Sequence, residues 1–400
     1  MTAGNEPAKA HLSRAGYGYL ALLLAFASLS TDLYLPAMPT MTEALGASHG
    51  SLELTISGYL LGFAIGQLFW GPYSDRRGRR IPLAMGLALF IIGSFGCGLA
   101  MNVVQLIAMR VVQAVGASAS VVIGRAIIAD LFQGKEAARI LSTLTAIMVV
   151  APMLGPLIGA RILAISSWRS IFFLLVAIGV ATLLMLFRII PESLPTSARN
   201  VTVKIVDRVA YRALFHNQRL VTYALISMIF TAGIFAYVAG SSFAFITWGG
   251  LSTDVFGLVF GSGAALIIAS NMANARLVSI FGTDTMLLAG VVVAISASVV
   301  LLIASIVGVS IWVIVVLVVL YAGSNGFIQA NAISGGLNSV SEGRGRASAF
   351  LGFTQYGGGM IGSAVLGLLA NDTPYPLFVI LAVTSIGSLF LILRVRSLAP

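Results

Sequence analysis

Long apolar runs alternate with short polar loops along the whole chain. A transmembrane helix needs about 20 mostly apolar residues, because it rises about 1.5 Å per residue across about 30 Å of hydrocarbon. The pattern therefore predicts an all-α membrane protein with 12 transmembrane helices. These are expected over residues 16–36, 52–73, 81–100, 103–128, 139–164, 169–190, 219–247, 255–274, 285–306, 309–333, 347–370 and 375–394.

The longest polar gap separates the first six spans from the last six. It contains Arg199, Lys204, Asp207, Arg208, Arg212 and His216. We therefore expect a cytoplasmic tail at 1–15, an N-terminal six-helix bundle at 16–190, a cytoplasmic linker at 191–218 and a C-terminal six-helix bundle at 219–396.

Composition supports the membrane interpretation. The chain is 58% hydrophobic and 9% charged, with a mean hydropathy of +1.01, whereas soluble proteins carry about 25% charged residues. The net charge of +10 is spread over short loops, and a nucleic-acid-binding protein would instead gather its basic residues as a patch on a soluble fold. A nucleic-acid partner is therefore not expected.

The basic residues also predict the orientation in the membrane. If the N-terminus is cytoplasmic, nearly all Lys and Arg residues fall in inner loops, and only Arg161 and Arg169 fall outside. Cytoplasmic loops are enriched in Lys and Arg. Both termini are therefore predicted to be cytoplasmic, which also requires an even number of spans.

One carboxylate, Asp32, interrupts the apolar run Leu20–Pro39. A charged side chain within a transmembrane helix costs about 2.5–3.5 kcal/mol on insertion scales and usually serves a function. The other acidic residues fall in loops or at span ends, Glu43 and Glu53 among them, so Asp32 is expected to be the only carboxylate within the membrane. Alternatively, Asp32 lies near enough to the outer interface, just before Pro36, for water to solvate it.

Arg110 is the one basic residue expected inside a span. At about 1.5 Å per residue, Asp32 lies about 24 Å and Arg110 about 20 Å from the inner surface. The two side chains are thus expected at similar depth. The alternative for Arg110 is that its long side chain reaches up to the outer interface.

The loop Gly71-Pro72-Tyr73-Ser74-Asp75-Arg76-Arg77-Gly78-Arg79-Arg80 resembles the signature loop G-x-x-x-D-R-x-G-R-[RK] of the major facilitator superfamily. Glycine permits tight turns and close helix approach. The resemblance implies a charged cytoplasmic latch that stabilises one of two alternating states. Its residues would be Gly71, Asp75, Arg76, Gly78, Arg79 and Arg80. The alternative, a topology anchor made of arginines, explains Arg77 but not the two glycines or the aspartate.

Three further segments resemble the drug:proton antiporter branch of this superfamily. Arg110, Gln113 and Gly116 are similar to its R-x-x-Q-x-x-G, and Gly155, Pro156 and Gly159 to its G-P-x-x-G. The string from Ser30 to Pro39 resembles the S-x-D-x-Y-L-P-A-x-P of the Bcr/CflA drug-resistance subfamily. The glycine pair also suits simple helix packing, and both roles are compatible.

The resemblance implies two six-helix bundles around a central cavity, lined by spans one and four. Asp32 and Arg110 would then couple transport to protons, directly paired or through water, because burial favours the neutral acid and a nearby arginine favours the carboxylate. Aromatic and weakly polar side chains would line the substrate pocket, although each is also suited to packing. The candidates are Tyr34, Tyr59, Gln113, Phe235, Tyr237, Gln329, Asn331 and Gln355.

Other chemistry has little support in the sequence. The three histidines lie in polar loops, away from the one cysteine, Cys97, and neither a nucleophile elbow nor a phosphate-binding loop is present. We expect no enzyme activity and no cofactor, with protons as the coupling ion.

The function expected is export of small neutral amphiphilic drugs, such as phenicol- or bicyclomycin-like antibiotics, by a monomer in the bacterial inner membrane. Transport of a metabolite such as a nucleoside or sugar is the alternative. A receptor or scaffold role is the third possibility, but it would need soluble signalling elements, and the sequence has no stretch long enough to form them.

Overall fold

A computed structural model describes residues 14–132, 140, 152–194, 199, 214–340 and 344–397. The first half of the chain is helical throughout these ranges. Its elements are α1 (Arg14–Asp32), a 3₁₀ turn η1 (Leu35–Ala37), α2 (Met38–Ala44), α3 (His49–Arg77), α4 (Arg80–Gly98), α5 (Val103–Leu131), a helix over Pro152–Ile165, and α7 (Trp168–Ile189).

The second half repeats this plan. It contains α9 (Gln218–Ser242), a π-helical turn η3 (Phe243–Trp248), α10 (Thr253–Phe281), α11 (Thr283–Val307), α12 (Ile311–Asn338), α13 (Arg344–Leu369) and α14 (Tyr375–Ser397). Ten helices in the described ranges are long and apolar enough to cross a membrane.

The two remaining predicted spans correspond to less complete or less apolar segments. Span 139–164 is described mainly as Pro152–Ile165, since most of its first half lies outside the described residues. Span 347–370 coincides with α13, whose glycines, Thr354 and Gln355 make it less apolar than its neighbours. Most of the predicted tail 1–15 and linker 191–218 also lies outside the described residues.

The first predicted span is not one continuous helix. A candidate membrane span covers Ala15–Ala44, as predicted, but its α-helix stops at Asp32 and the chain continues through η1 into α2. Proline cannot continue an α-helix because it lacks the backbone N–H and clashes with the preceding turn, and Pro36 and Pro39 follow within seven residues. The functional candidate Asp32 therefore lies at a helix end rather than inside a helix.

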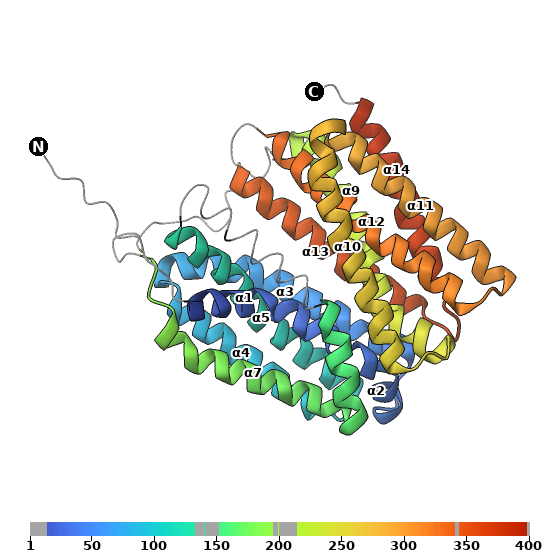
Figure 1. Ribbon diagram of the computed structural model, residues 1–400. Coiled ribbons are helices and arrows are strands. Elements are labelled where there is room, and N and C mark those ends of the chain that lie inside the picture. Colours follow the sequence, from blue (N-terminus) through green and yellow to red (C-terminus); the bar gives the residue numbers. More distant parts are fainter. Residues whose placement is uncertain are drawn as a thin grey trace, which may run out of the picture.

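Each half is held together by its own helix contacts. In the first half α5 packs against α1, α3 and α4, and α4 packs against α7. In the second half α9 packs against α12, α13 and α14, and α10 and α11 pack against α12. Figure 1 shows the two sets of helices meeting at one end and diverging towards the side where both termini lie.

We name the two sides by the predicted orientation: the inner side carries the loop from Arg76 to Arg80, and the outer side carries α2. Contacts between the halves run from the outer side to the middle. Ser57 donates to Ser363 (2.9 Å), Ser242 donates to the Leu35 carbonyl (2.5 Å), and the rings of Phe63 and Tyr356 lie 5.0 Å apart. The described structure is thus closed on the outer side, with the halves apart on the inner side.

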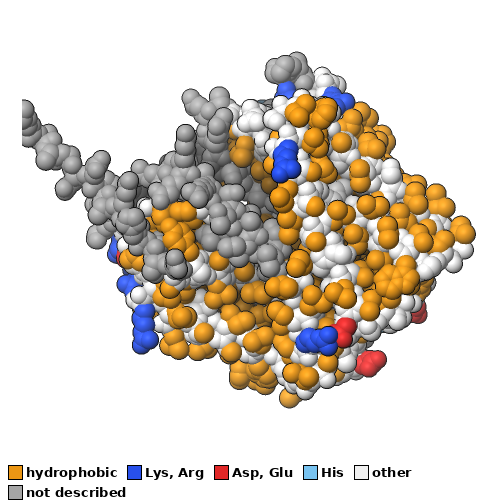
Figure 2. Space-filling view, viewed as in Figure 1, with side chains coloured by type: hydrophobic (Ala, Val, Ile, Leu, Met, Phe, Trp, Pro, Cys, Tyr) orange, Lys and Arg blue, Asp and Glu red, His pale blue; other side chains and the backbone are white. Residues whose placement is uncertain are grey.

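The outer surface of the bundle suits a lipid environment. Figure 2 shows hydrophobic side chains over most of the visible face, with the charged side chains near its edges. Lipid tails accept such a surface, whereas monomeric soluble proteins rarely expose large contiguous apolar patches.

Candidate proton and substrate site

Asp32 is the last residue of α1, and its side chain is only 5% exposed. The hydroxyl of Thr31 donates to Asp32 Oδ1 (3.1 Å). The C-terminal end of a helix carries partial negative charge, so the helix end does not help to stabilise an ionised carboxylate there. Solvation of Asp32 at the outer interface does not fit this buried position.

The helix that carries the Gly155-Pro156 motif presses against the break after α1. A Cβ atom at Gly155 would lie 2.9 Å from the Cβ of Asp32, and one at Gly159 would overlap the Leu33 carbonyl oxygen. Only glycine permits such close approach of two backbones. The packing role predicted for the glycine pair is therefore seen, and the motif glycines contact the segment that carries Asp32.

The opposite face of this motif helix meets the other half of the chain. Leu157 and Met153 lie against Gly257 and Gly261 of α10, where added Cβ atoms would come within 2.9 and 3.1 Å. The motif helix is therefore placed between the Asp32 segment and the second half. A shift of one half relative to the other would act on Asp32 through this helix.

Arg110 lies in the middle of α5 and is fully buried. Its Nη1 donates to the Ser30 carbonyl (2.8 Å) and to Gln113 Oε1 (2.6 Å). Its Nε and Nη2 have no hydrogen-bond partner. The depth estimate placed Arg110 correctly near Asp32, since the two interact electrostatically, but no ion pair within 4.0 Å joins these two described residues.

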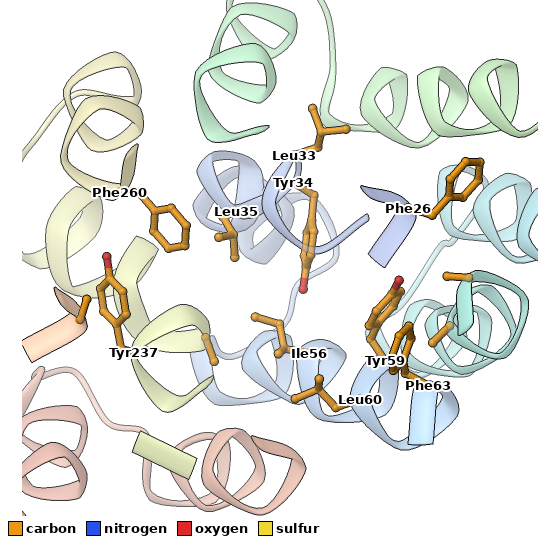
Figure 3. Packing of buried hydrophobic residues seen from close by; sticks show 14 of the residues in the cluster. Phe26, Leu33, Tyr34, Leu35, Ile56, Tyr59, Leu60, Phe63, Tyr237 and Phe260 are labelled. Carbon is orange, nitrogen blue, oxygen red and sulfur yellow. The ribbon is translucent and has the colours of Figure 1, made fainter. Parts of the chain in front are cut away.

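Two tyrosines enclose the Arg110 guanidinium. Its central carbon lies 4.4 Å from the ring centre of Tyr34 and 4.3 Å from that of Tyr59. Such cation–π contacts stabilise a desolvated guanidinium by about 2 kcal/mol. Tyr34 is also hydrogen-bonded to Thr55 (2.9 Å), and Figure 3 shows both rings between the first and third helices. The Arg110 side chain thus lies buried between two aromatic rings and does not reach the outer interface.

Gln113 completes the cluster in the first half. It accepts from Arg110 and donates through Nε2 to Ser94 of α4 (2.8 Å). Gly93 makes this possible, because a Cβ there would overlap the Gln113 backbone. The structure therefore brings together five of the predicted site residues, namely Asp32, Arg110, Tyr34, Tyr59 and Gln113.

Tyr237 reaches this cluster from α9 in the second half. Its ring stacks on Phe260 at 5.6 Å, its hydroxyl has no hydrogen-bond partner, and it interacts electrostatically with Asp32. Figure 3 shows Tyr237 and Phe260 side by side, across from Leu35 and Tyr34. Phe235, by contrast, packs on Gly359 of α13.

The predicted amides of the second half serve different contacts. Gln329 accepts from Ser227 (2.7 Å) and donates to Thr231 (2.5 Å), which links α12 to α9. Asn331 donates to Asn274 of α10 (2.6 Å). Gln355 is half-buried on α13, beside Tyr356. The second half thus contributes neutral polar groups to its helix seams.

The latch residues form a compact cluster at the inner end of the first half. Arg79 donates to Asp75 (2.5 Å), to Ser74 (2.8 Å) and to Asp130 (2.8 Å). Burial alone would lower the pKa of Arg79, but its hydrogen bonds and charge interactions with Asp130 and Asp75 outweigh burial and raise the pKa. Arg79 therefore stays charged. Arg80 donates to the Phe187 carbonyl (2.5 Å) and lies over the Phe187 ring.

Two latch partners were missed from the sequence. Asp130 is in the last turn of α5 and Glu192 follows α7, so neither belongs to the signature loop. The Glu192 carboxylate accepts from the backbone N–H groups of Arg79 (2.7 Å) and Arg80 (3.3 Å). The only signal available was their place among the inner-side acidic residues, facing several arginines.

The two signature glycines have different explanations. Gly78 has a φ of +86°, and a Cβ there would meet the Glu192 carboxylate at 2.6 Å, so glycine is required. At Gly71 a Cβ would be 3.8 Å from Val122, an ordinary contact. The expectation that both glycines allow close approach is therefore correct for Gly78 and not for Gly71.

Asp32 is not the only buried carboxylate in the spans. Glu53, in the second turn of α3, is 3% exposed. Glu53 was expected in a loop or at a span end, outside the membrane interior, but it lies within the candidate span His49–Arg77 and the second half of the chain covers it. Within the described part of the chain, no group of three or more His, Cys, Asp or Glu side chains is placed to hold a metal ion.

Sequence comparison connects this arrangement to known transporters. A profile of the Major Facilitator Superfamily matches residues 20–363. An uncharacterized MFS-type transporter, YdgK, of Bacillus subtilis is 32% identical over 92% of both chains. A bicyclomycin resistance protein homolog of Haemophilus influenzae is 26% identical over 90% of both chains. A chloramphenicol resistance protein of Pseudomonas aeruginosa is 28% identical over 88% of this chain and 84% of its own length.

Solved structures share the fold over nearly the whole chain. A crystal structure of the nucleoside transporter NupG superposes with a TM-score of 0.79 at 14% identity, covering 95% of this chain and 99% of that one. A D-xylose-proton symporter gives 0.74 at 17% identity, covering 94% and 95%. These likenesses confirm the predicted all-α transporter fold. With its profile match and its multi-pass helices, the chain belongs to the major facilitator superfamily, whose members are membrane transporters rather than enzymes.

Proposed function

We propose that this protein exports small, neutral, amphiphilic drugs in exchange for protons by alternating access. The observation that carries the proposal is the buried Asp32 at the break after α1, held by Gly155 and within electrostatic reach of Arg110. Ionisable groups inside a membrane protein are expensive and mark ion or proton pathways.

The proton step uses the carboxyl of Asp32. In the outward-open state it takes a proton from the outer solution, and in the inward-open state it returns that proton to the cytoplasm and becomes a carboxylate. One charge crossing about 100 mV releases about 2.3 kcal/mol, and each pH unit adds about 1.4 kcal/mol. Together these free energies sustain a cargo gradient of several hundred-fold.

Arg110 and the glycine helix have separate roles in this cycle. Two guanidinium nitrogens of Arg110 lack hydrogen-bond partners, so the group is available to bind the Asp32 carboxylate once the proton leaves. The Gly155–Gly159 helix lies between Asp32 and α10. Movement of the second half would thereby change the surroundings of Asp32 and its preference for a proton.

The cargo class follows from the groups around the site. Tyr34 and Tyr59 place aromatic rings around Arg110, and Tyr237 adds a third ring and a hydroxyl without a hydrogen-bond partner from the second half. Such surroundings suit an uncharged molecule with both apolar and hydrogen-bonding parts. Relatives named for chloramphenicol and bicyclomycin resistance support this class of cargo. The expected location is the cytoplasmic membrane of a bacterium, where the chain works as a monomer.

The test is proton release from purified protein in detergent when chloramphenicol or a bicyclomycin-type drug is added. We expect substrate-linked release from the unmodified protein and none from Asp32→Asn, while both bind the drug. Glu43→Gln is the matched control, because Glu43 is an exposed carboxylate of α2. Equal release from Asp32→Asn would overturn the role of Asp32.

A parallel uptake assay separates drugs from metabolites. Vesicles containing the protein are given a proton gradient and offered labelled chloramphenicol, uridine or xylose. We expect gradient-dependent transport of the drug. Transport of the nucleoside or the sugar without the drug would replace drug export by metabolite transport, with the same proton site.

A further inference from the structure

We propose that Glu53 is a second proton-binding site, which takes a proton from the outer solution when the outer side of the transporter closes. The proposal rests on the alternating access of the proposed function. It concerns a different carboxylate from Asp32, on a different helix, and its test measures conformation rather than drug transport.

Glu53 lies where the two halves meet. Its side chain is 3% exposed, and Oε2 has no hydrogen-bond partner. A Cβ atom at Gly240 of α9 would lie 3.7 Å from Oε1, so the carboxyl faces the backbone of the second half. One turn further along α3, Ser57 donates to Ser363 of α13. Glu53 is therefore part of the outer seam between the halves.

Two small cavities flank the carboxyl, each with a volume of about 10 Å³. This is about the space that one water molecule needs. Glu53 and Phe243 line both cavities, and apolar side chains such as Met38, Leu52 and Leu366 supply most of the remaining walls. The cavities place the carboxyl within reach of single water molecules in an otherwise dry seam.

The titratable groups around Glu53 form no ion pair with it, although His49 lines one of the two cavities. His49 lies one turn away on α3, Glu43 is on α2, and Asp372 lies in the loop before α14. His49 interacts electrostatically with Asp372 and stacks near Phe243. No lysine or arginine lines either cavity, and no ion pair within the described residues includes Glu53.

Desolvation then decides the protonation state in the closed seam. An ionised carboxylate buried without a partner costs several kcal/mol, so the group is retained as the neutral acid. Opening the outer side would part α3 from α9 and α13 and admit water, which stabilises the carboxylate. Closing would reverse this: the carboxylate binds one proton from outer water, an O–H bond forms, and no other reactant is needed.

This linkage makes the outer seam sensitive to outer pH. Low outer pH stabilises the closed outer side, and high outer pH stabilises the open one. In the proposed exporter, Asp32 takes its proton in the outward-open state, and closure of the outer side follows. Glu53 would therefore favour closure after a proton has arrived from the acidic outer solution.

The experiment measures access to Ser363→Cys from outside, in whole cells, with a membrane-impermeant maleimide. The background carries Cys97→Ala, to remove the only other thiol, and Asp32→Asn, to remove titration at the first site. We expect the labelling rate to rise at least about fivefold between an outer pH of about 5.5 and about 8.5, since one titrating group changes an equilibrium by up to about tenfold per pH unit. With Glu53→Gln added, labelling should stay low at every pH.

Three controls make the result specific. Glu53→Asp should keep a pH-dependent rise, because a carboxyl remains. Glu43→Gln and His49→Gln should keep the parent profile. Where Glu53→Gln is not recovered in the membrane, Glu53→Met replaces it as a neutral side chain of similar size.

Three results would overturn the proposal. The first is a pH-dependent rise with Glu53→Gln that equals the parent. The second is a rise that disappears with His49→Gln and persists with Glu53→Gln. The third is the absence of any pH dependence in the parent. The labelling experiment is carried out with Asp32→Asn. Its outcome therefore does not depend on whether the drug-linked proton release proposed for Asp32 is observed.

Discussion

The two halves of the molecule use the same helix packing for different chemistry. In the first half, Gly159 brings a glycine-containing helix against the Leu33 carbonyl, beside Asp32. In the second half, Gly358 and Gly362 of α13 bring that helix against the Met228 and Ala232 carbonyls of α9. The helix in the second half is continuous there, whereas α1 has ended. The same close approach thus holds a charged site in one half and a neutral seam in the other.

The inner loops differ in the same way. Gly78 and Gly282 have nearly the same backbone conformation, with φ of +86° and +78°. Around Gly78 lie the Arg79 ion pairs and the Glu192 carboxylate. A Cβ at Gly282 would meet nothing within 4 Å, and the nearby Asp284 accepts from Tyr223 and pairs with Arg219 (3.6 Å). The two loops therefore share a backbone conformation at their glycine. The buried arginine network around Arg79 belongs to the first loop.

The comparison predicts that removing a charged side chain harms transport and stability most in the first half. Arg110→Ala should have the largest effect on both. Removing a charge from a buried network costs about 3–5 kcal/mol, and Tyr34, Tyr59 and Gln113 would lose their shared partner. We expect loss of drug efflux by at least about 100-fold and a lower melting temperature. Arg169→Ala is the control, because Arg169 lies at the outer end of α7. Efflux at the parent rate would contradict the role of Arg110.

The two inner loops can be compared directly by removing one arginine from each. Arg79→Ala should lower stability by about 2–3 kcal/mol, because it leaves Asp75 and Asp130 without their partner. Arg276→Ala should change stability by less than about 0.5 kcal/mol, since Arg276 is exposed. Thermal unfolding of the purified proteins in one detergent measures both. Equal effects would show that the second loop has kept a latch of its own.

The glycine helices give a smaller and more selective prediction. Gly159→Ala and Gly362→Ala each force a carbonyl contact to shift and should cost about 1–3 kcal/mol. Only Gly159→Ala should also reduce drug-linked proton release, because it moves the segment that carries Asp32. Gly357→Ala is the control, since a Cβ there meets nothing within 4 Å. The same loss of proton release with Gly362→Ala would remove the distinction between the halves.

The neutral contacts between α9 and α12 should affect drug binding rather than proton release. Gln329→Leu removes hydrogen bonds to Ser227 and Thr231 and should weaken drug binding by about threefold to tenfold, the equivalent of about 1 kcal/mol. Proton release per drug bound should be unchanged. Binding titration combined with pH measurement tests both quantities. A change in proton release would mean that the second half also takes part in coupling.

Much of the fold could be predicted from linear features of the sequence. Apolar length and the placement of Lys and Arg depend on local composition, so they predict the spans and the orientation without three-dimensional information. The depth of Arg110 followed from residue counting along its span. The clustering of Arg110 with Tyr34, Tyr59 and Gln113 was expected only through the family resemblance, because it requires knowing which spans are neighbours.

The errors have a common physical cause, which is burial by a distant segment. The sequence placed Glu53 in a loop or at a span end, but Gly240 and Phe243 of the second half cover it. Asp130 and Glu192 lie outside the signature loop in the sequence, and both bind Arg79 in the folded chain. The break after Asp32 was missed because the length of an apolar run does not show where the helical hydrogen bonds stop. Pro36 and Pro39 were a local signal of that break.

The sequence by itself determined that this chain is a helical membrane protein with a carboxylate inside its first apolar run, because hydrophobicity, charge and motif residues are properties of single positions. Only the tertiary structure decided which groups that carboxylate faces, that a second carboxyl lies dry in the outer seam, and that the first half holds the charged cluster. Those are properties of pairs of positions, set by which helices pack together.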